Sequence, residues 1–284
     1  MRRLFFIALF TLNSSIFAID WSRENFCPTG DVERVLKIIS TMTVEEKVGQ
    51  VIMADLDFVK PSDLKKYPLG GILNGGNTSP NGKLRSTPQE WRALAQDFHD
   101  NSIRRGGANI PVLWGTDAVH GHSNVFGATI YPHNIGLGAT QNRNLLRKIG
   151  SAVAEEVLAT GLFWTFAPTV TVPQDYRWGR TYEGYSESPE LVNLLGQAFI
   201  EGLQGTEDDF LSDKKIIGTA KHFLGDGGTF LGRDQGDTKT TEDALKQIHG
   251  TSYFGALDSC IQTVMASFNS WNGSKLHGNE YLLT

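Results

Sequence analysis

Short apolar runs alternate with stretches of helical period along the chain after residue 30. Six short runs are largely apolar and mostly do not alternate with polar residues, over 51–56, 71–74, 111–116, 163–168, 216–222 and 263–268. This pattern is typical of strands that are buried on both faces of a parallel sheet. Between these runs, apolar residues recur at intervals of three and four, which predicts amphipathic helices.

The expected helices have recognisable starts and stops. The segment 43–46 reads Thr-Val-Glu-Glu, a capping box in which the threonine and the second glutamate satisfy the first amide groups of a helix. The segment 87–90 repeats this device with proline at the first helical position. We expect helices over 31–42, from 43 onward, and over 87–105, 144–160, 188–204 and 241–258.

Strands that alternate with helices predict βα units and an α/β fold. The length of 284 residues suits a TIM-like (β/α)8 barrel, which takes roughly 250 residues. About six of the eight βα units are visible, so we expect an incomplete barrel. No linker or change of composition divides the chain, and residues 19–284 are expected to form one domain.

The first eighteen residues are set apart from this pattern. Arg2 and Arg3 precede an apolar stretch over 4–12, and Ser14 to Ala18 offers a cleavage site, which is the layout of a secretory signal peptide. The alternative, a membrane anchor, needs about 20 apolar residues and finds too few. The sequence therefore predicts export to a periplasm or out of the cell, with no membrane attachment after cleavage.

Composition excludes some functions. Hydrophobic residues make up 40%, enough for a core, so intrinsic disorder is excluded. Lys and Arg number 26 against 31 Asp and Glu, and the net charge of -5 gives no field that would attract nucleic acid. Cys27 and Cys260 either pair in an oxidising compartment or remain free thiols, and two cysteines do not decide between these. Nothing specifies an oligomeric state.

Polar residues follow the strands where each strand ends. Asp117 follows the run over 111–116, Arg180 lies beyond the run over 163–168, and Lys221 and His222 end the run over 216–222. The carboxyl ends of parallel strands in a barrel meet in one mouth, where such barrels place their sites. An aspartate in this position can also be a simple helix cap, and Arg177 or Arg180 can brace a loop. A lysine rarely ends a core strand without a partner, because its desolvation is costly.

Two further features leave alternatives open. Trp178 and Trp271 could stack on a sugar ring or belong to the core. His120 and His122 have the His-x-His spacing of a metal site, and Lys221 could carry a bridging carboxylate, as in metal-dependent amidohydrolase barrels. That pair usually follows the first strand, whereas here it follows the third.

Several motifs resemble glycoside hydrolase family 3, and they occur in the family's order over roughly residues 30 to 284. They read Gly-Thr-Asp-Ala-Val-His-Gly at 115–121, Ala-Thr-Ile-Tyr-Pro-His-Asn-Ile-Gly-Leu-Gly-Ala-Thr at 128–140, Phe-Ala-Pro at 166–168, Arg-Trp-Gly-Arg-Thr-Tyr-Glu at 177–183, Ala-Lys-His-Phe at 220–223 and Ser-Trp-Asn-Gly at 270–273. The resemblance is to the N-terminal domain of the exo-acting β-glucosidase and β-glucanase branch. The hexosaminidase branch carries a histidine in the loop after Lys-His, where this chain has Asp226.

The resemblance implies a retaining β-glucosidase that removes terminal non-reducing β-D-glucosyl residues from glucosides and β-glucan oligosaccharides. It implies that Asp117, Arg180, Lys221 and His222 bind the glucosyl hydroxyls, with no cofactor and no metal.

The catalytic carboxylates of the family have no counterpart in the sequence. In this family the nucleophile is the aspartate of a Ser-Asp-Trp motif, and that motif does not occur in residues 1–284. The acid/base glutamate comes from a following α/β domain. We therefore expect both residues to lie beyond Thr284, in a chain that is truncated before its nucleophile, has no catalytic residue of its own and shows no turnover alone. The alternative is a non-catalytic sugar-binding remnant.

Overall fold

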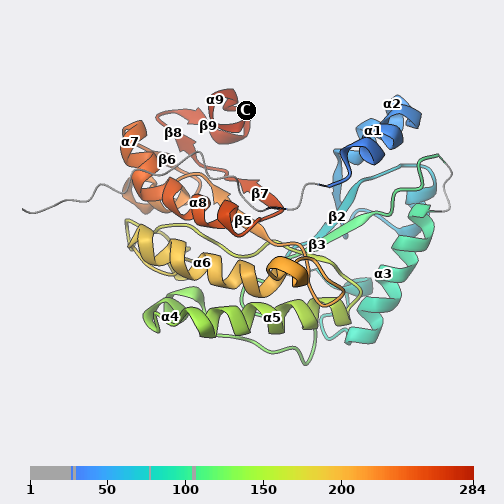
Figure 1. The fold of residues 1–284 in the computed structure, drawn as a ribbon, viewed down its shortest axis with the longest axis horizontal. Helices are drawn as coiled ribbons and strands as arrows, with labels where there is room; N and C mark the ends of the chain where they lie inside the picture. The colour runs from blue at the N-terminus through green and yellow to red at the C-terminus, as the bar shows by residue number, and fades with distance from the viewer. Residues whose placement is uncertain (1–26, 28–29, 77, 104–106) are drawn as a thin grey trace, which may run out of the picture.

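The chain folds around a curved parallel sheet with helices on its outside (Figure 1). The computed structural model describes residues 27, 30–76, 78–103 and 107–284. The expected signal peptide over 1–18 lies outside the described residues. Among the described residues, no helix combines the length and the apolarity needed to cross a bilayer.

Six parallel strands follow one another in chain order across the sheet. The strands β1 (Met53–Asp55), β2 (Gly71–Asn74), β3 (Leu113–Thr116) and β4 (Trp164–Thr165) form one ladder. Bridges between Trp164 and Ile217 and between Thr169 and Lys221 connect this ladder to β5 (Thr219–Phe223), which pairs with β7 (Thr263–Ala266). Six consecutive strands of a TIM-like barrel are thus present. In the part of the chain that the structure describes, β1 and β7 are not joined and the barrel stays open.

The helices that the sequence predicts begin and end close to the predicted residues, and two short helices, which begin at residues 134 and 280, were not predicted. The helices are α1 (Val32–Thr41), α2 (Val44–Gln50), α3 (Pro88–Ile103), α4 (Asn134–Ala139), α5 (Arg143–Ala159), α6 (Pro189–Gln204), α7 (Glu242–Ala244), α8 (Thr251–Asp258) and α9 (Glu280–Leu283). The capping box at Thr43 and Glu46 is present with both of its hydrogen bonds. The helix expected over 241–258 is interrupted, because a π-helical turn over Leu245–Gly250 separates α7 from α8.

The C-terminal end of the chain adds a small second sheet. The strands β6 (Asp237–Thr238), β8 (Ser270–Trp271) and β9 (Ser274–Lys275) form it, with β8 and β9 antiparallel. No alternation in this part of the sequence is long enough to predict these two-residue strands. The sheet holds the loops after β5 and β7 together at the strand ends.

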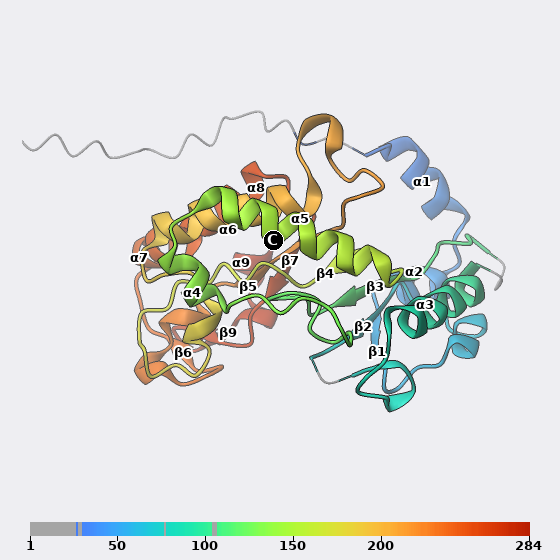
Figure 2. The same cartoon turned by 90° about the horizontal axis from the view of Figure 1, so that it is seen from below.

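The core lies between the sheet and the helix pair α5 and α6, which run side by side in both views (Figures 1 and 2). Fully buried side chains on these helices include Leu146, Val153, Leu195 and Leu203. They cover the strands β3 to β5 from outside, and this fixes the carboxyl ends of those strands in one place.

The N-terminal helices contrast with this core. No residue of α1 is buried, and its apolar residues Val35, Leu36 and Ile39 are exposed. Helix α1 lies at one end of the molecule (Figure 2). Cys27, which precedes it, forms a disulfide with Cys260, with the two Cα atoms 5.3 Å apart. Of the two alternatives that the sequence left open, a disulfide and two free thiols, the structure shows the disulfide.

Candidate functional site

Three of the four polar residues expected at the strand ends, Asp117, Arg180 and Lys221, line one cavity, and His222 lies behind Arg180 without lining it. The cavity has a volume of about 290 Å³ and lies at the carboxyl ends of β3, β4 and β5. Its lining combines charged, hydroxyl and aromatic side chains, among them Asp117, His120, Thr169, Arg180, Tyr182, Glu183 and Lys221. A cavity of this size with convergent polar groups is the usual form of a small-molecule site.

Lys221 and Asp117 form an ion pair at the cavity. The Lys221 Nζ donates to Asp117 Oδ1 at 2.8 Å, although 104 residues separate them in the sequence. The Lys221 side chain is only 5% exposed, whereas a third of the Asp117 side chain is exposed. The lysine therefore has the partner that its burial demands, and its other two N–H groups remain available to a ligand.

A bulge allows His222 to join the same site as its neighbour Lys221. In a regular strand, consecutive side chains point to opposite faces. Here Lys221 pairs with Met265 and Phe223 pairs with Ala266, so His222 is an extra residue without a partner on β7. Bulges redirect side chains in this way and occur next to active sites.

Arg180 also lines the cavity and comes from the loop that follows β4. Its Nε and Nη2 donate to the two carboxylate oxygens of Glu183 at 2.6 and 2.8 Å, and Nη2 also lies 3.1 Å from His222 Nε2. Burial alone would lower the pKa of Arg180, but the hydrogen bonds and charge of Glu183, with Asp226 and Asp234, raise it above its ordinary value. The guanidinium therefore stays charged.

The four residues expected at the site thus form two contacting pairs, Lys221 with Asp117 and Arg180 with His222, which are joined by the peptide bond between Lys221 and His222. Arg177 lies away from them, because it is exposed and forms an ion pair with Asp175. Trp178 is buried and donates to Asp234 through its ring nitrogen at 3.0 Å, so it belongs to the core and does not offer a face to a ligand. Trp271 is half-buried and donates to the Thr240 carbonyl.

Aromatic rings form one side of the cavity. His133 packs edge-on against His120, with ring centroids 4.5 Å apart, and against Tyr182, at 4.6 Å. Burial lowers the pKa of His120, and the neighbouring His133 lowers it further. A neutral imidazole beside a tyrosine gives this wall a largely apolar character.

The metal-site alternative finds no support in this geometry. His120 lines the cavity, but His122 is buried against Trp91, and its Nε2 lies 3.0 Å from the Thr160 hydroxyl. Burial lowers the pKa of His122 to about 4. Among the residues that the structure describes, no three His, Cys, Asp or Glu side chains are grouped so that they could hold a metal ion.

Sequence reasoning missed two carboxylates of the site. Glu183 orients Arg180, and its spacing of three residues in the motif over 177–183 is the available signal. Asp226 is buried and accepts from His222, at 2.9 Å between Nδ1 and Oδ2. The sequence places Asp226 in the loop after Lys221 and His222, where the hexosaminidase branch has a histidine, but gives no sign of its contact with His222.

The last residue of the chain lies outside the cavity. Thr284 follows α9, and its backbone N–H donates to the Glu280 carbonyl at 3.0 Å. It is exposed and does not line the cavity. No contact of the described residues tests the placement of the nucleophile and the acid/base residue beyond Thr284, and this placement stays a prediction.

Comparison with known proteins identifies the relatives of this chain. Residues 43–284 match the model of the glycosyl hydrolase family 3 N-terminal domain. An exo-1,3/1,4-beta-glucanase from a Pseudoalteromonas species superposes with a TM-score of 0.88 and 47% identity, covering 91% of this chain and 32% of that one. The beta-glucosidase from Listeria innocua shares the fold, with a TM-score of 0.73 and 24% identity over 88% of this chain and 34% of that one.

Two further relatives, each 27% identical, extend this picture. The lysosomal beta glucosidase of Dictyostelium discoideum is 27% identical over 267 residues, which cover 87% of this chain and 32% of that protein. The periplasmic beta-glucosidase of Salmonella typhimurium is 27% identical over 255 residues, covering 88% and 30%. The chain therefore spans about a third of the length of these relatives.

Proposed function

This chain belongs to glycosyl hydrolase family 3, and from that premise we propose that its cavity binds the terminal non-reducing β-D-glucosyl unit of a glucoside or β-glucan oligosaccharide. The observation that carries the proposal is the convergence of Asp117, Lys221 and Arg180 on one cavity. Charged groups of both signs suit a sugar, because each hydroxyl group both donates and accepts a hydrogen bond. The aromatic wall suits the apolar face of the ring.

Within this proposal each residue has a distinct part. Asp117 accepts from the sugar hydroxyls with the lone pairs that Lys221 leaves free, and Lys221 donates with its remaining N–H groups. Arg180 donates to an adjacent hydroxyl, and His222, which does not line the cavity, takes part through its contact with the Arg180 guanidinium. A sugar with one inverted hydroxyl would leave a buried charge without a partner, so the site discriminates against it.

The reaction that we propose for the whole enzyme is retaining hydrolysis of β-D-glucosidic bonds. That mechanism needs a nucleophilic carboxylate and an acid/base carboxyl about 5–5.5 Å apart. The cavity carboxylates of the described residues are already engaged, Asp117 with Lys221 and Glu183 with Arg180. We propose that neither is the nucleophile, and that residues 1–284 bind glucose without catalysing turnover.

We also propose that the protein is exported, to a periplasm or out of the cell. The apolar stretch after Arg2 and Arg3 supports this, and so does the disulfide between Cys27 and Cys260. Disulfides persist mainly in oxidising compartments. A periplasmic relative is consistent with this location.

The test combines calorimetric titration with an activity assay on the chain of 284 residues. We expect glucose and gluconolactone to bind, galactose to bind at least about tenfold more weakly, and an aryl β-glucoside to remain unhydrolysed. Lys221→Met should abolish glucose binding, whereas Arg177→Met, which removes a charge outside the cavity, should leave it unchanged. Equal affinity for glucose and galactose would overturn the binding proposal. Hydrolysis of the aryl β-glucoside that Asp117→Asn abolishes would overturn the proposal that residues 1–284 bind without catalysing turnover.

A further inference from the structure

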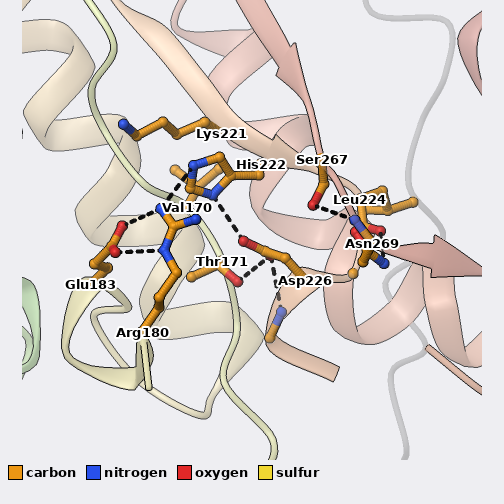
Figure 3. Close-up of polar contacts among 12 residues, drawn as sticks. Val170, Thr171, Arg180, Glu183, Lys221, His222, Leu224, Asp226, Ser267 and Asn269 are labelled. Atoms are coloured by element: carbon orange, nitrogen blue, oxygen red, sulfur yellow. Dashed lines mark hydrogen bonds and ion pairs between the residues drawn. The ribbon is translucent and has the colours of Figure 1, made fainter. Parts of the chain in front are cut away.

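A chain of polar contacts connects Glu183, which lines the cavity, with the buried Asp226 (Figure 3). It begins at Glu183 and passes through Arg180 and His222 to Asp226. Asp226 is nearly fully buried, and both of its oxygens are engaged. Oδ2 faces His222, while Oδ1 accepts from the Thr171 hydroxyl and from the Gly227 N–H at 3.0 Å.

The partners of His222 decide which ring nitrogen carries its proton. A guanidinium has only N–H donors, so Arg180 must donate to His222 Nε2, and this nitrogen must present its lone pair. The proton of the neutral ring is therefore on Nδ1. Asp226 Oδ2 lies 2.9 Å from Nδ1 and accepts that proton, because an ionised carboxylate only accepts.

This arrangement also determines what Arg180 offers to a ligand. Its Nε and Nη2 hydrogens are all used, on Glu183 and His222. Within the described residues, Nη1 has no partner, and Arg180 lines the cavity. Nη1 is thus the donor left for a ligand, and its direction depends on a histidine that accepts through Nε2.

We propose that Asp226 is a positioning residue that holds His222 in the tautomer with hydrogen on Nδ1 and thereby aims the Arg180 guanidinium at the bound sugar. The part of this inference that concerns the sugar rests on the proposed function, whereas the tautomer is a property of the protein without ligand. Asp226 itself does not line the cavity.

The variant Asp226→Asn tests this with nearly unchanged shape. The Gly227 N–H is a fixed backbone donor, so it holds the amide oxygen of the new side chain toward itself. The amide nitrogen then faces His222 Nδ1 and donates to it. His222 must accept through Nδ1 and carry its proton on Nε2, where it opposes the N–H of Arg180. The predicted result is a change of tautomer and a misplaced guanidinium.

The experiment is nitrogen NMR of the seven histidine rings in the full chain without ligand, with His222→Gln used to assign the His222 signals. In the wild-type protein we expect hydrogen on Nδ1, and in Asp226→Asn we expect it on Nε2. Thr171→Val is the matched control, because it removes one hydrogen bond from Asp226 and leaves the contact with His222. Its tautomer should be that of the wild type.

Glucose titration of the same variants measures the consequence for binding. Asp226→Asn should weaken glucose binding roughly tenfold or more, the usual effect of losing a hydrogen bond to a charged group, and Thr171→Val should change it little. A wild-type His222 with hydrogen on Nε2 would overturn the inference, even if Asp226→Asn does not fold. An unchanged tautomer in folded Asp226→Asn would also overturn it. Wild-type protein with the expected tautomer but no glucose binding contradicts only the proposed function.

Discussion

At the scale of single residues, the ion pair between Lys221 and Asp117 joins stability to binding. A buried ammonium is costly to desolvate, and its attraction to a carboxylate repays this cost only in part. The pair is therefore poor at stabilising the fold compared with apolar side chains of the same size. Its presence at the cavity is better explained by the need for a charged donor and a charged acceptor that face the ligand together.

This view predicts the effect of removing one partner. Asp117→Ala leaves the Lys221 charge buried without a partner, which should lower the free energy of unfolding by about 1–3 kcal/mol. The value lies below the usual cost for a buried pair because a third of the Asp117 side chain is exposed. Urea unfolding measures it. The double variant Asp117→Ala/Lys221→Met should regain most of this loss and still fail to bind glucose. If the double variant is no more stable than Asp117→Ala, the buried charge is not the cause.

His122 shows a second residue effect, a dependence of stability on pH. Burial lowers its pKa from 6.5 to about 4, so between these values the unfolded chain binds a proton that the folded chain does not. The free energy of unfolding is therefore unaffected by the titration of His122 above pH 6.5, and it decreases as the pH falls from 6.5 toward 4. Between about pH 7 and pH 5 the free energy of unfolding should decrease by roughly 2 kcal/mol on account of His122.

The measurement is urea unfolding at about pH 7 and pH 5 for the wild-type protein and His122→Gln, whose amide can replace the hydrogen bond to Thr160. The variant should lose roughly 2 kcal/mol less over this interval, whatever its stability at neutral pH. His249, whose pKa burial also lowers to about 4, keeps its own contribution in both proteins. Equal losses in both proteins would show that His122 titrates normally.

At the scale of elements, the contact between α5 and α6 explains glycines that propensity alone would count as defects. A glycine inside a helix costs up to about 1 kcal/mol relative to alanine. Gly202 faces α5 so closely that a Cβ would lie 2.2 Å from the Arg147 carbonyl oxygen, and a Cβ on Gly150 would lie 2.4 Å from the Phe199 carbonyl oxygen. The two helices pack backbone against backbone at these positions.

Alanine at these positions should therefore destabilise the protein despite its better helix propensity. Gly202→Ala should lower the free energy of unfolding by about 1–3 kcal/mol, because backbone must move to make room. Gly136→Ala in α4 is the matched control, since its nearest contact would be at 3.6 Å. That change should be neutral or stabilising by up to about 1 kcal/mol. Denaturant unfolding of both variants decides, and equal effects would contradict the close packing.

The elements also show how far the sequence could predict the structure. The helices expected over 144–160 and 188–204 agree with α5 and α6 within one residue at each end, because Asn142 and Ser188 cap them locally. The strand predicted over 71–74 agrees with β2, whereas the other five predicted strands are longer than those observed, since an apolar run continues beyond the residues that pair. The π-helical turn before α8 could not be predicted, because no local residue pattern distinguishes it from an α-helix.

For the site, the sequence could predict where some residues lie but could not predict their contacts. Asp117, Lys221 and Arg180 could be placed at the strand ends, because the order of strands alone brings those ends together. Their partners could not be assigned, since contacts such as Lys221 with Asp117 depend on the curvature of the sheet. The bulge that turns His222 toward Arg180 and the buried role of Asp226 also arise only from tertiary packing.

At the scale of the whole molecule, the disulfide connects the segment before α1 to the turn between α8 and β7. Cys27 and Cys260 are 233 positions apart, and a loop of that size gives a large entropic effect in the unfolded chain, at the upper end of the usual range of about 2–5 kcal/mol. The net stabilisation by the disulfide is smaller than this, because α1 buries no residue and residues 30–41 can detach from the folded protein at little cost.

We therefore expect a local effect of removing this disulfide. Cys27→Ser/Cys260→Ser should lower the free energy of global unfolding by no more than about 2 kcal/mol, near the bottom of the usual range. Hydrogen exchange of α1 amides should accelerate far more than that of α5 and α6, whose inner faces are buried. A reducing agent should reproduce both changes in the wild-type protein and have no effect on the double variant. The contrary result would be a loss near the upper end of that range, about 5 kcal/mol, with hydrogen exchange accelerated equally in α1, α5 and α6. It would mean that α1 unfolds together with the rest of the protein and is held by contacts other than burial of its own side chains.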